Sequence, residues 1–245
     1  MRNIRILIQY EGTRYQGWQR QSSTDNTIQG KLEALLARMC GETIELQGSG
    51  RTDAGVHALG QVANFHTDCA MSPEEMRIYI NRYLPEDIAV VEVAEVPPRF
   101  HSRLNARGKH YVYRVINSDV PDVFRRRYAL EVPEPLDVAA MKRAAALLLG
   151  EHDFKSFTSA KKGKKSTVRR IDEIAITAEG ALLCFSFRGN GFLHHMIRIL
   201  MGTLLEVGMG KREPESMTDI LEACDREQAG PLVPAKGLTL TEVFF

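Results

Sequence analysis

Residues 43–66 read TIELQGSGRTDAGVHALGQVANFH, and this segment distinguishes between the possible classes of fold. Two segments, at about 43–48 and 60–66, have the residue pattern of strands and flank a glycine-rich loop. The loop therefore joins one strand to another strand. A dinucleotide-binding loop joins a strand to a helix instead, and its glycines follow a G-x-G-x-x-G spacing that this loop does not match. The sequence thus argues against a Rossmann-type nucleotide site here.

The elements on either side complete a βαββαβ order. Before the loop come an alternating strand at residues 3–10 and an apolar helix that Thr27 caps and Gly41 closes. After the loop, the capping box Ser72-Pro73-Glu74-Glu75 predicts a helix to about Tyr83. A strand over 87–96 follows and ends at two prolines.

The second half of the chain repeats this order with one helix added. The pattern predicts a strand at 108–117, a helix from the Asp137 cap to Gly150, strands at 168–177 and 181–187, an apolar helix at 192–207, a helix that Ser216-x-x-Asp219 caps, and a strand at 238–244. We therefore expect an α+β fold of two tandem ferredoxin-like halves with mainly antiparallel sheets and an active-site cleft between them. Residues 1–104 would carry the Asp53 loop, and residues 105–245 would carry the extra helix.

Composition narrows the class of protein. The 245 residues are 44% hydrophobic and 26% charged, which is ordinary for a globular protein and excludes disordered and fibrous classes. No apolar run approaches the ~20 residues of a membrane-spanning helix, and the N-terminus lacks a signal-peptide core, so we expect a soluble, cytoplasmic protein. The cysteines show no Cys-x-x-Cys spacing, which favours reduced thiols over a disulfide framework or a zinc site: Cys40, Cys69, Cys184 and Cys224.

The distribution of charge suggests a polyanionic partner. The formal net charge is only +1, but no acidic residue interrupts residues 99–114 or residues 155–170. A solvated loop would explain one such run. Two acid-free runs in a chain of balanced charge favour basic faces that contact phosphates. The second run contains the densest cluster of lysines: Lys161, Lys162, Lys164 and Lys165.

The loop within residues 43–66 holds one candidate catalytic carboxylate, Asp53, two residues after Arg51. An arginine beside a carboxylate keeps it ionised, which suits a nucleophile or an electrostatic stabiliser. An aspartate that merely stabilises its own turn, with Arg51 as a surface partner, explains the pattern equally well. The absence of a second obvious carboxylate argues against a glycosidase-type acid–base pair.

Three further features have both a structural and a functional interpretation. Tyr111 and Tyr113 share one face of a predicted strand, either as core residues or as a ring on which a nucleobase stacks. His194 and His195 are adjacent on a predicted helix and so point about 100° apart, which favours a buried or capping role over a zinc pair. Arg198, on the same apolar helix, either extends its charge to solvent or pairs with a carboxylate in a cleft.

The block Gly50-Arg51-Thr52-Asp53-Ala54-Gly55-Val56-His57-Ala58 closely resembles the tRNA pseudouridine synthase A family. The resemblance extends along essentially the whole chain. It includes Tyr10-x-Gly12…Gly17-Trp18-Gln19-x-Gln21, Lys109-x-Tyr111-x-Tyr113, Gly150-x-His152-Asp153-Phe154-x-x-Phe157, Gly191-Phe192-Leu193-x-x-Met196-x-Arg198 and Pro234-Ala235-x-Gly237-Leu238. Val233 stands where the family more often has alanine.

This resemblance implies an enzyme that isomerises uridine to pseudouridine at positions 38, 39 and 40 of the tRNA anticodon stem-loop. It further implies a reaction without cofactor or metal, and a homodimer in which one tRNA touches both subunits. Asp53 would be the nucleophile, Arg51 and Arg198 its charged neighbours in the substrate site, and Tyr111 the ring packed on the target base. Whether Asp53 attacks the ribose C1′ or the uracil C6 is left open.

Two other classes of protein remain as alternatives. One is a non-catalytic RNA-binding protein built from two modules of RRM-like topology. The third strands of the two halves, at 60–66 and 181–187, lack the aromatic-rich pattern with which such modules stack bases. The other alternative is a metal-dependent RNA hydrolase.

Overall fold

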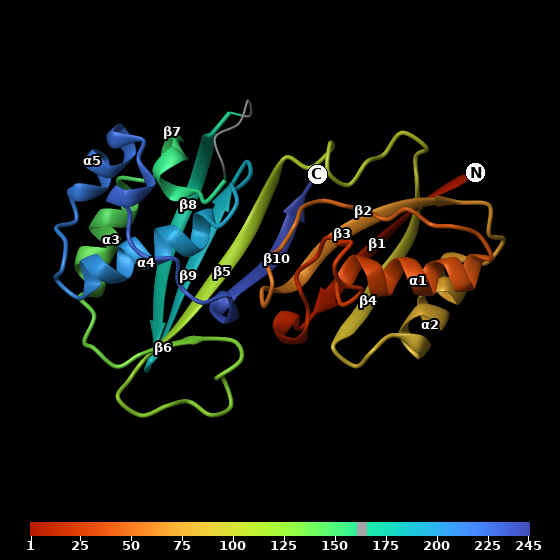
Figure 1. Ribbon diagram of the computed structural model, residues 1–245, viewed down its shortest axis with the longest axis horizontal. Coiled ribbons are helices and arrows are strands. Elements are labelled where there is room, and N and C mark those ends of the chain that lie inside the picture. The colour runs from red at the N-terminus through yellow and green to blue at the C-terminus, as the bar shows by residue number, and fades with distance from the viewer. Residues whose placement is uncertain (161–165) are drawn as a thin grey trace. The chain divides into compact units, whose positions relative to one another are not determined.

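The computed structural model describes residues 1–160 and 166–245 and shows a mixed α+β protein (Figure 1). The chain forms two compact units. Unit 1 comprises residues 1–107 and 239–245, and unit 2 comprises residues 108–238. The last strand thus lies with the first unit, although it is at the far end of the sequence. The division into functional domains at residues 104 and 105 stays a prediction.

Unit 1 follows the predicted order of elements. These are β1 (Arg2–Tyr10), a short 3-10 turn η1 (Gly12–Arg14), α1 (Ile28–Cys40), β2 (Gln47–Gly48), β3 (His57–Thr67), α2 (Pro73–Tyr83) and β4 (Ile88–Val96). The sheet order is β4-β1-β3-β10, where β10 is Leu238–Phe244, and β2 also pairs with β3. β1 runs antiparallel to both β3 and β4, whereas β10 runs parallel to β3.

Alternation along β1 explains how the core of unit 1 forms. Ile4, Ile6 and Ile8 all point to one face and are 0% exposed. Helices α1 and α2, which contact each other, supply Leu32 and Ile80 as further buried side chains. Figure 1 shows the two helices side by side in orange and gold. These apolar side chains between the sheet and the two helices of unit 1 are thereby excluded from water.

The helix ends of unit 1 confirm the predicted caps. The Thr27 hydroxyl accepts a hydrogen bond from the amide of Gly30, and Gly41 ends α1 in the left-handed conformation. At the start of α2, the amide of Glu75 donates to the Ser72 hydroxyl, and the Glu75 carboxylate accepts from the amide of Ser72. Local side-chain chemistry therefore fixes where both helices begin.

The predicted strand at 43–48 is wrong for most of its length, since only Gln47 and Gly48 pair with β3. Side chains of α1 replace the missing strand partner. The amide of Leu46 donates to the Glu33 carboxylate at 3.0 Å, and its carbonyl accepts from the Gln29 amide group at 3.0 Å. The alternation of Ile44 and Leu46 reflects burial of both side chains without strand pairing.

Unit 2 contains more elements than predicted. These are β5 (Gly108–Asn117), β6 (Leu130–Val132), α3 (Val138–Ala146), β7 (Gly150–Asp153), η2 (Phe154–Phe157), β8 (Val168–Glu179), β9 (Leu182–Gly189), α4 (Met196–Gly208), α5 (Ser216–Ala223), η3 (Arg226–Gln228) and η4 (Ala235–Gly237). The sheet order is β5-β9-β8-β7, antiparallel throughout, with β6 parallel to β5. The helices α3, α4 and α5 gather beside β7, β8 and β9 (Figure 1).

Three boundaries in unit 2 differ from the prediction. The helix after the Asp137 cap ends at Ala146, and Gly150 instead opens β7 with a φ of 93°. The helix predicted at 192–207 begins only at Met196, because His195 adopts a left-handed backbone with a φ of 64°. Ser216 does not cap α5: it is the first helical residue, and its hydroxyl donates to the carbonyl of Glu213.

The four cysteines are free thiols at partly buried positions. Across residues 1–160 and 166–245, no helix combines the length and the apolar composition that crossing a membrane requires.

Candidate active site

The Asp53 loop of unit 1 occupies the connection between β2 and β3, and a second loop holds it from one side. The amide of Trp18 donates to the carbonyl of Thr52 at 3.0 Å. The hydroxyls of Tyr10 and Thr52 are also hydrogen-bonded, at 2.7 Å. Burial raises the pKa of Tyr10, so this phenol stays protonated in neutral solution. The residue that precedes Asp53 is thus fixed through both its backbone and its side chain.

The segment that follows Asp53 is fixed in the same way. The amide of Val56 donates to the carbonyl of Asp53 at 3.1 Å and closes a tight turn, in which Gly55 has a φ of 79°. The next residue, His57, accepts a hydrogen bond at Nδ1 from the amide of Gly12 at 3.0 Å. The Asp53 side chain remains partly exposed. A carboxylate on a fixed backbone with access to solvent can act as a nucleophile toward a bound substrate.

Two glycines of the Tyr10–Gln21 loop permit this close packing. A Cβ atom on Gly17, whose φ is 88°, would lie 2.7 Å from the carbonyl oxygen of Thr52. A Cβ atom on Gly12 would lie 2.0 Å from the carbonyl oxygen of Val56. The two backbones therefore approach so closely on both sides of Asp53 that no larger residue fits.

Arg51 lies in the same loop with an exposed side chain. Its Nε donates to Oε1 of Gln19 at 2.9 Å. The loop that fixes the backbone around Asp53 therefore also holds the arginine side chain. The role of Arg51 in binding substrate stays a prediction.

Tyr111 and Arg198, the other two residues of the expected site, belong to unit 2. Tyr111 lies on β5 opposite Phe187, and its ring meets that of Phe192 edge to face with the ring centroids 5.5 Å apart. Arg198 lies on α4, and its Nε donates to the carbonyl of Val233 at 2.8 Å. Both side chains thus have defined neighbours, and their contacts with a substrate stay predictions.

Tyr113, two residues beyond Tyr111 on β5, reaches the same connecting segment as Arg198. Its hydroxyl donates to the carbonyl of Pro234 at 2.8 Å. Burial raises the pKa of Tyr113, against a smaller opposite effect of the Arg198 charge, so the phenol stays neutral. Tyr113 is therefore a structural core residue, as one of the two interpretations of this pair predicted.

His194 and His195 lie before α4 rather than on it. His195 occupies the residue before the first turn, and no side-chain hydrogen bond caps the helix there. The two imidazole rings stack with centroids 3.6 Å apart and an interplanar angle of 29°. The carbonyl of His194 accepts from the Thr158 hydroxyl at 3.0 Å. The expected 100° separation was wrong because it assumed a helical backbone at these two residues.

The structure describes the whole acid-free run at residues 99–114 but only part of the run at residues 155–170. Lys161, Lys162, Lys164 and Lys165 lie outside the described residues. Later in that run, burial lowers the pKa of Arg169, and this side chain donates to the carbonyls of Ser166 and Val168. The contact of either run with phosphates stays a prediction.

A group of buried polar residues near the Asp53 loop was not predicted from the sequence. Gln29 and Glu33, on α1, are only 8% and 7% exposed. A signal was available, because two polar residues spaced i, i+4 share the buried face of α1 with Ile28, Leu32 and Leu36. Buried polar groups at such positions require partners, and here the partners come from the loop that contacts Arg51 and from the backbone of Leu46.

Comparisons with known proteins place the chain among tRNA pseudouridine synthases. A family model described as tRNA pseudouridine synthase matches residues 6–105 and 144–245, which include Arg51, Asp53 and Arg198 but not Tyr111. A tRNA pseudouridine synthase A of Bacillus sp. (strain KSM-64) is 48% identical over 245 residues, the whole of both chains. The enzyme of the same name from Brevibacillus brevis is 47% identical over 245 residues, again the whole of both chains.

A third relative, the tRNA pseudouridine synthase A of Halalkalibacterium halodurans, is 48% identical over 239 residues, which cover 97% of this chain and 90% of that protein. Among solved structures, an archaeal box H/ACA sRNP Nop10-Cbf5 complex matches 95% of this chain and 58% of its own, at 12% identity and a TM-score of 0.37.

Proposed function

This chain belongs to the tRNA pseudouridine synthase family and isomerises uridine in tRNA, and we propose where and how it does so. The proposed targets are positions 38, 39 and 40 of the anticodon stem-loop, and the proposed nucleophile is Asp53. The observation that carries the proposal is the match of the family model across both units, including the Asp53 loop. The packing around Thr52 and Val56 supports it, because a nucleophile requires a fixed position.

The isomerisation balances without any external reactant. The N1–C1′ bond of uridine breaks, the uracil turns, and a C5–C1′ bond forms, while C5 loses a proton and N1 gains one. The Asp53 carboxylate would attack either C1′ or C6 in the first step and would leave when the new bond is complete. Both routes need an ionised carboxylate, and Arg51 and Arg198 are proposed as the charged groups that bind substrate near it.

The target uridine must leave the helical stack before Asp53 can reach it. We assign Tyr111 as the ring that packs on the displaced base, since an aromatic face offsets part of the cost of unstacking. The contact with Phe192 fixes one edge of the Tyr111 ring and supports this assignment. A neutral phenol is a weak base, so stacking explains a tyrosine better than proton transfer does.

Replacing Tyr111 by phenylalanine should preserve most activity, whereas alanine should lower kcat/KM by about tenfold to a hundredfold, the range expected for loss of one base–aromatic stack. Steady-state kinetics on an unmodified tRNA transcript measure both values. Tyr128, an exposed tyrosine of unit 2, serves as a control, and its phenylalanine variant should match the wild type. An equal loss in the Tyr111 phenylalanine and alanine variants would assign the role to the hydroxyl instead.

The proposed reaction uses neither a cofactor nor a metal. Turnover should therefore stay unchanged after dialysis against a chelator, and the RNA product should keep its length. Gel analysis of the product beside an assay of pseudouridine tests both points together. RNA cleavage that stops on chelation and returns with a divalent cation would favour the metal-dependent hydrolase.

We further propose that the enzyme is cytoplasmic and a homodimer that binds tRNA with both subunits, as the resemblance implies. The description as two tandem ferredoxin-like halves with a cleft between them is likewise a proposal. In unit 1, the βαββαβ order and the strand order β4-β1-β3, with β2 beside β3, support it. In unit 2, the short strands β6 and β7 interrupt the repeat.

The choice of target can be tested with tRNA transcripts that carry a C5-tritiated uridine at only one of positions 38, 39 and 40. Formation of the C5–C1′ bond releases the C5 hydrogen, so each active position should release tritium to water. A transcript with cytidine at all three positions and labelled uridine elsewhere should release none. Release from that control alone would place the reaction at uridines other than positions 38, 39 and 40 and overturn the positional proposal.

A further inference from the structure

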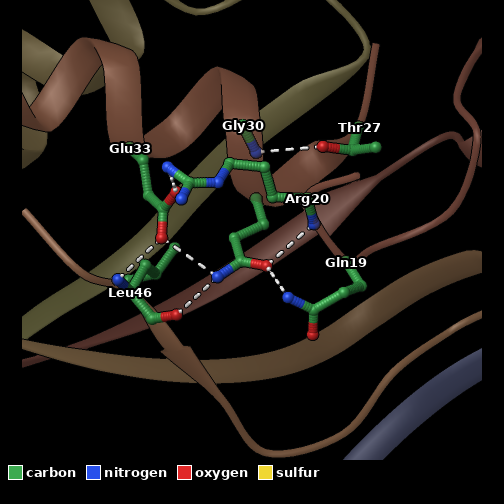
Figure 2. Close-up of polar contacts among 7 residues, drawn as sticks. Gln19, Arg20, Thr27, Gly30, Glu33 and Leu46 are labelled. Carbon is green, nitrogen blue, oxygen red and sulfur yellow. Dashed lines mark hydrogen bonds and ion pairs between the residues drawn. The ribbon is translucent and has the colours of Figure 1, made fainter. Parts of the chain in front are cut away.

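A chain of hydrogen bonds connects a buried carboxylate on α1 with Arg51. Gln29 uses all four of its side-chain hydrogen-bonding positions. Its Nε2 donates to Oε1 of Glu33 and to the carbonyl of Leu46, each at 3.0 Å. Its Oε1 accepts from Nε2 of Gln19 at 2.8 Å and from the amide of Arg20 at 2.9 Å. Figure 2 shows these contacts, with Glu33 and Leu46 on one side and Gln19 and Arg20 on the other.

The hydrogen bonds of this series all run in one donor-to-acceptor direction, which ends at the Glu33 carboxylate. The Glu33 carboxylate has only acceptor positions: Oε1 accepts from Gln29 and from the amide of Leu46, and Oε2 accepts from Arg20 at 3.3 Å. Glu33 therefore draws the NH2 group of Gln29 toward itself. The carbonyl of the Gln29 side chain then points away from α1, and only a donor can meet it.

The orientation of the Gln29 amide fixes the orientation of the Gln19 side-chain amide. Because Gln29 offers an acceptor, Gln19 turns its NH2 group inward and its Oε1 outward. That Oε1 accepts from Nε of Arg51 at 2.9 Å. If the Gln19 amide were reversed, its NH2 group would face the Nε–H of Arg51, and two donors cannot pair. The carboxylate on α1, together with the backbone groups of Leu46 and Arg20 that also bind Gln29, thus determines that Gln19 presents an acceptor to Arg51.

Arg51 is held at one end and open at the other. A guanidinium group is planar and carries five N–H donors in a fixed arrangement. With Nε bound to Gln19, the two Nη groups have no protein partner within residues 1–160 and 166–245. The edge formed by two N–H groups fits a phosphate group through paired hydrogen bonds. Fixing Nε in advance lowers the rotamer entropy that a phosphate contact would otherwise remove from this exposed side chain.

We propose that Gln19, Gln29 and Glu33 are positioning residues that orient the guanidinium of Arg51 toward a phosphate of the substrate RNA, an assignment that rests on the proposed function. Gln19 acts on Arg51 directly, whereas Gln29 and Glu33 act through Gln19. The loop and α1 thereby connect the substrate-binding face to the buried side of unit 1.

A double-mutant cycle tests the first link. Gln19→Met removes the acceptor for Nε, and Arg51→Lys keeps the charge but removes Nε. Gln19→Met alone should lower kcat/KM by about tenfold, the usual size of a lost hydrogen bond to a charged group. In the Arg51→Lys background the same change should have no further effect. An equal additional loss in both backgrounds, or no loss in either, would overturn the assignment.

Gln21 gives a matched control from the same loop. It is exposed, and its Nε2 donates to the carbonyl of Gln16 rather than to the chain that reaches Arg51. Gln21→Met should change kcat/KM by no more than about twofold, the scale of an ordinary surface substitution. A loss as large as that of Gln19→Met would mean that disruption of the loop, and not the orientation of Arg51, is measured.

A second experiment does not depend on activity. The Nε–H resonance of Arg51, assigned by its loss in Arg51→Lys, should exchange slowly with water in the wild-type protein. Exchange should become as fast as in an unrestrained arginine in Gln19→Met and also in Gln29→Met, although Gln29 does not touch Arg51. Slow exchange in a folded Gln29→Met protein would contradict the proposal that Gln29 acts on Arg51 through Gln19. If the wild type formed no pseudouridine, the proposed function would be wrong. The exchange measurement would still show whether Gln29 and Gln19 hold Arg51.

Discussion

Asp53→Asn should abolish pseudouridine formation while tRNA binding persists. The amide keeps the size of the carboxylate and its place between Thr52 and Ala54, but it can neither attack carbon nor stabilise a cationic sugar as an anion does. Loss of a nucleophile typically lowers kcat by about 10⁴-fold or more. Contacts with phosphates determine most of the affinity for RNA and do not involve Asp53. The expected result is therefore a tightly binding, inactive protein.

Single-turnover assays and a binding titration at one fixed salt concentration measure the two effects separately. Asp25→Asn is a suitable control, because Asp25 is an exposed aspartate of the same unit. It should leave both activity and binding unchanged. Normal turnover in Asp53→Asn would remove Asp53 from the role of nucleophile. Loss of binding together with activity would indicate that the carboxylate holds the loop in shape.

Gly12→Ala should destabilise unit 1 and inactivate the enzyme, although Gly12 has no chemical role. The new Cβ would lie 2.0 Å from the carbonyl oxygen and 2.7 Å from the carbonyl carbon of Val56. These are backbone atoms, so no rotation of a side chain relieves the overlap. The loop must move away from residues 55–57, which also strains the hydrogen bond from Gly12 to His57.

We expect a loss of about 3 kcal/mol in the free energy of unfolding, near the upper range for overpacking. For a chain of this size, that loss lowers the midpoint of thermal unfolding by roughly 6–12 °C. Gly41→Ala provides the control, since its Cβ meets nothing within 4 Å and only the positive φ of 72° opposes it. That change should cost about 1–2 kcal/mol and leave activity intact. Equal midpoints for the two variants would contradict the close packing inferred at Gly12.

The parts of the fold that local chemistry dictates could be read from the sequence. The cap at Thr27, the capping box at Ser72 and the strand at 108–117 depend on neighbouring residues, and the structure confirms each. The strand expected at 43–48 could not be excluded, because its pairing is replaced by Gln29 and Glu33, side chains of a preceding helix. Periodicity does not reveal such a substitution.

The candidate site likewise has residues that the sequence predicted and contacts that only the structure shows. Residue type and loop context suggested Asp53 and Arg51, and the whole-chain resemblance added Tyr111 and Arg198. The contacts that fix the Asp53 loop involve Gly12 and Trp18, far from it in sequence, and only the structure shows them. The backbone at His195 was missed because the apolar pattern of α4 continues past the residue that interrupts the helix. Long-range packing, rather than local preference, determines these features.

The most direct test of the central claim is a map of pseudouridine at single-base resolution in unmodified tRNA after incubation with the wild-type protein. We predict that pseudouridine appears at positions 38, 39 and 40 wherever uridine stands there, and at no other position. A tRNA that remains unmodified, or that carries pseudouridine only outside the anticodon stem-loop, would contradict the proposed function.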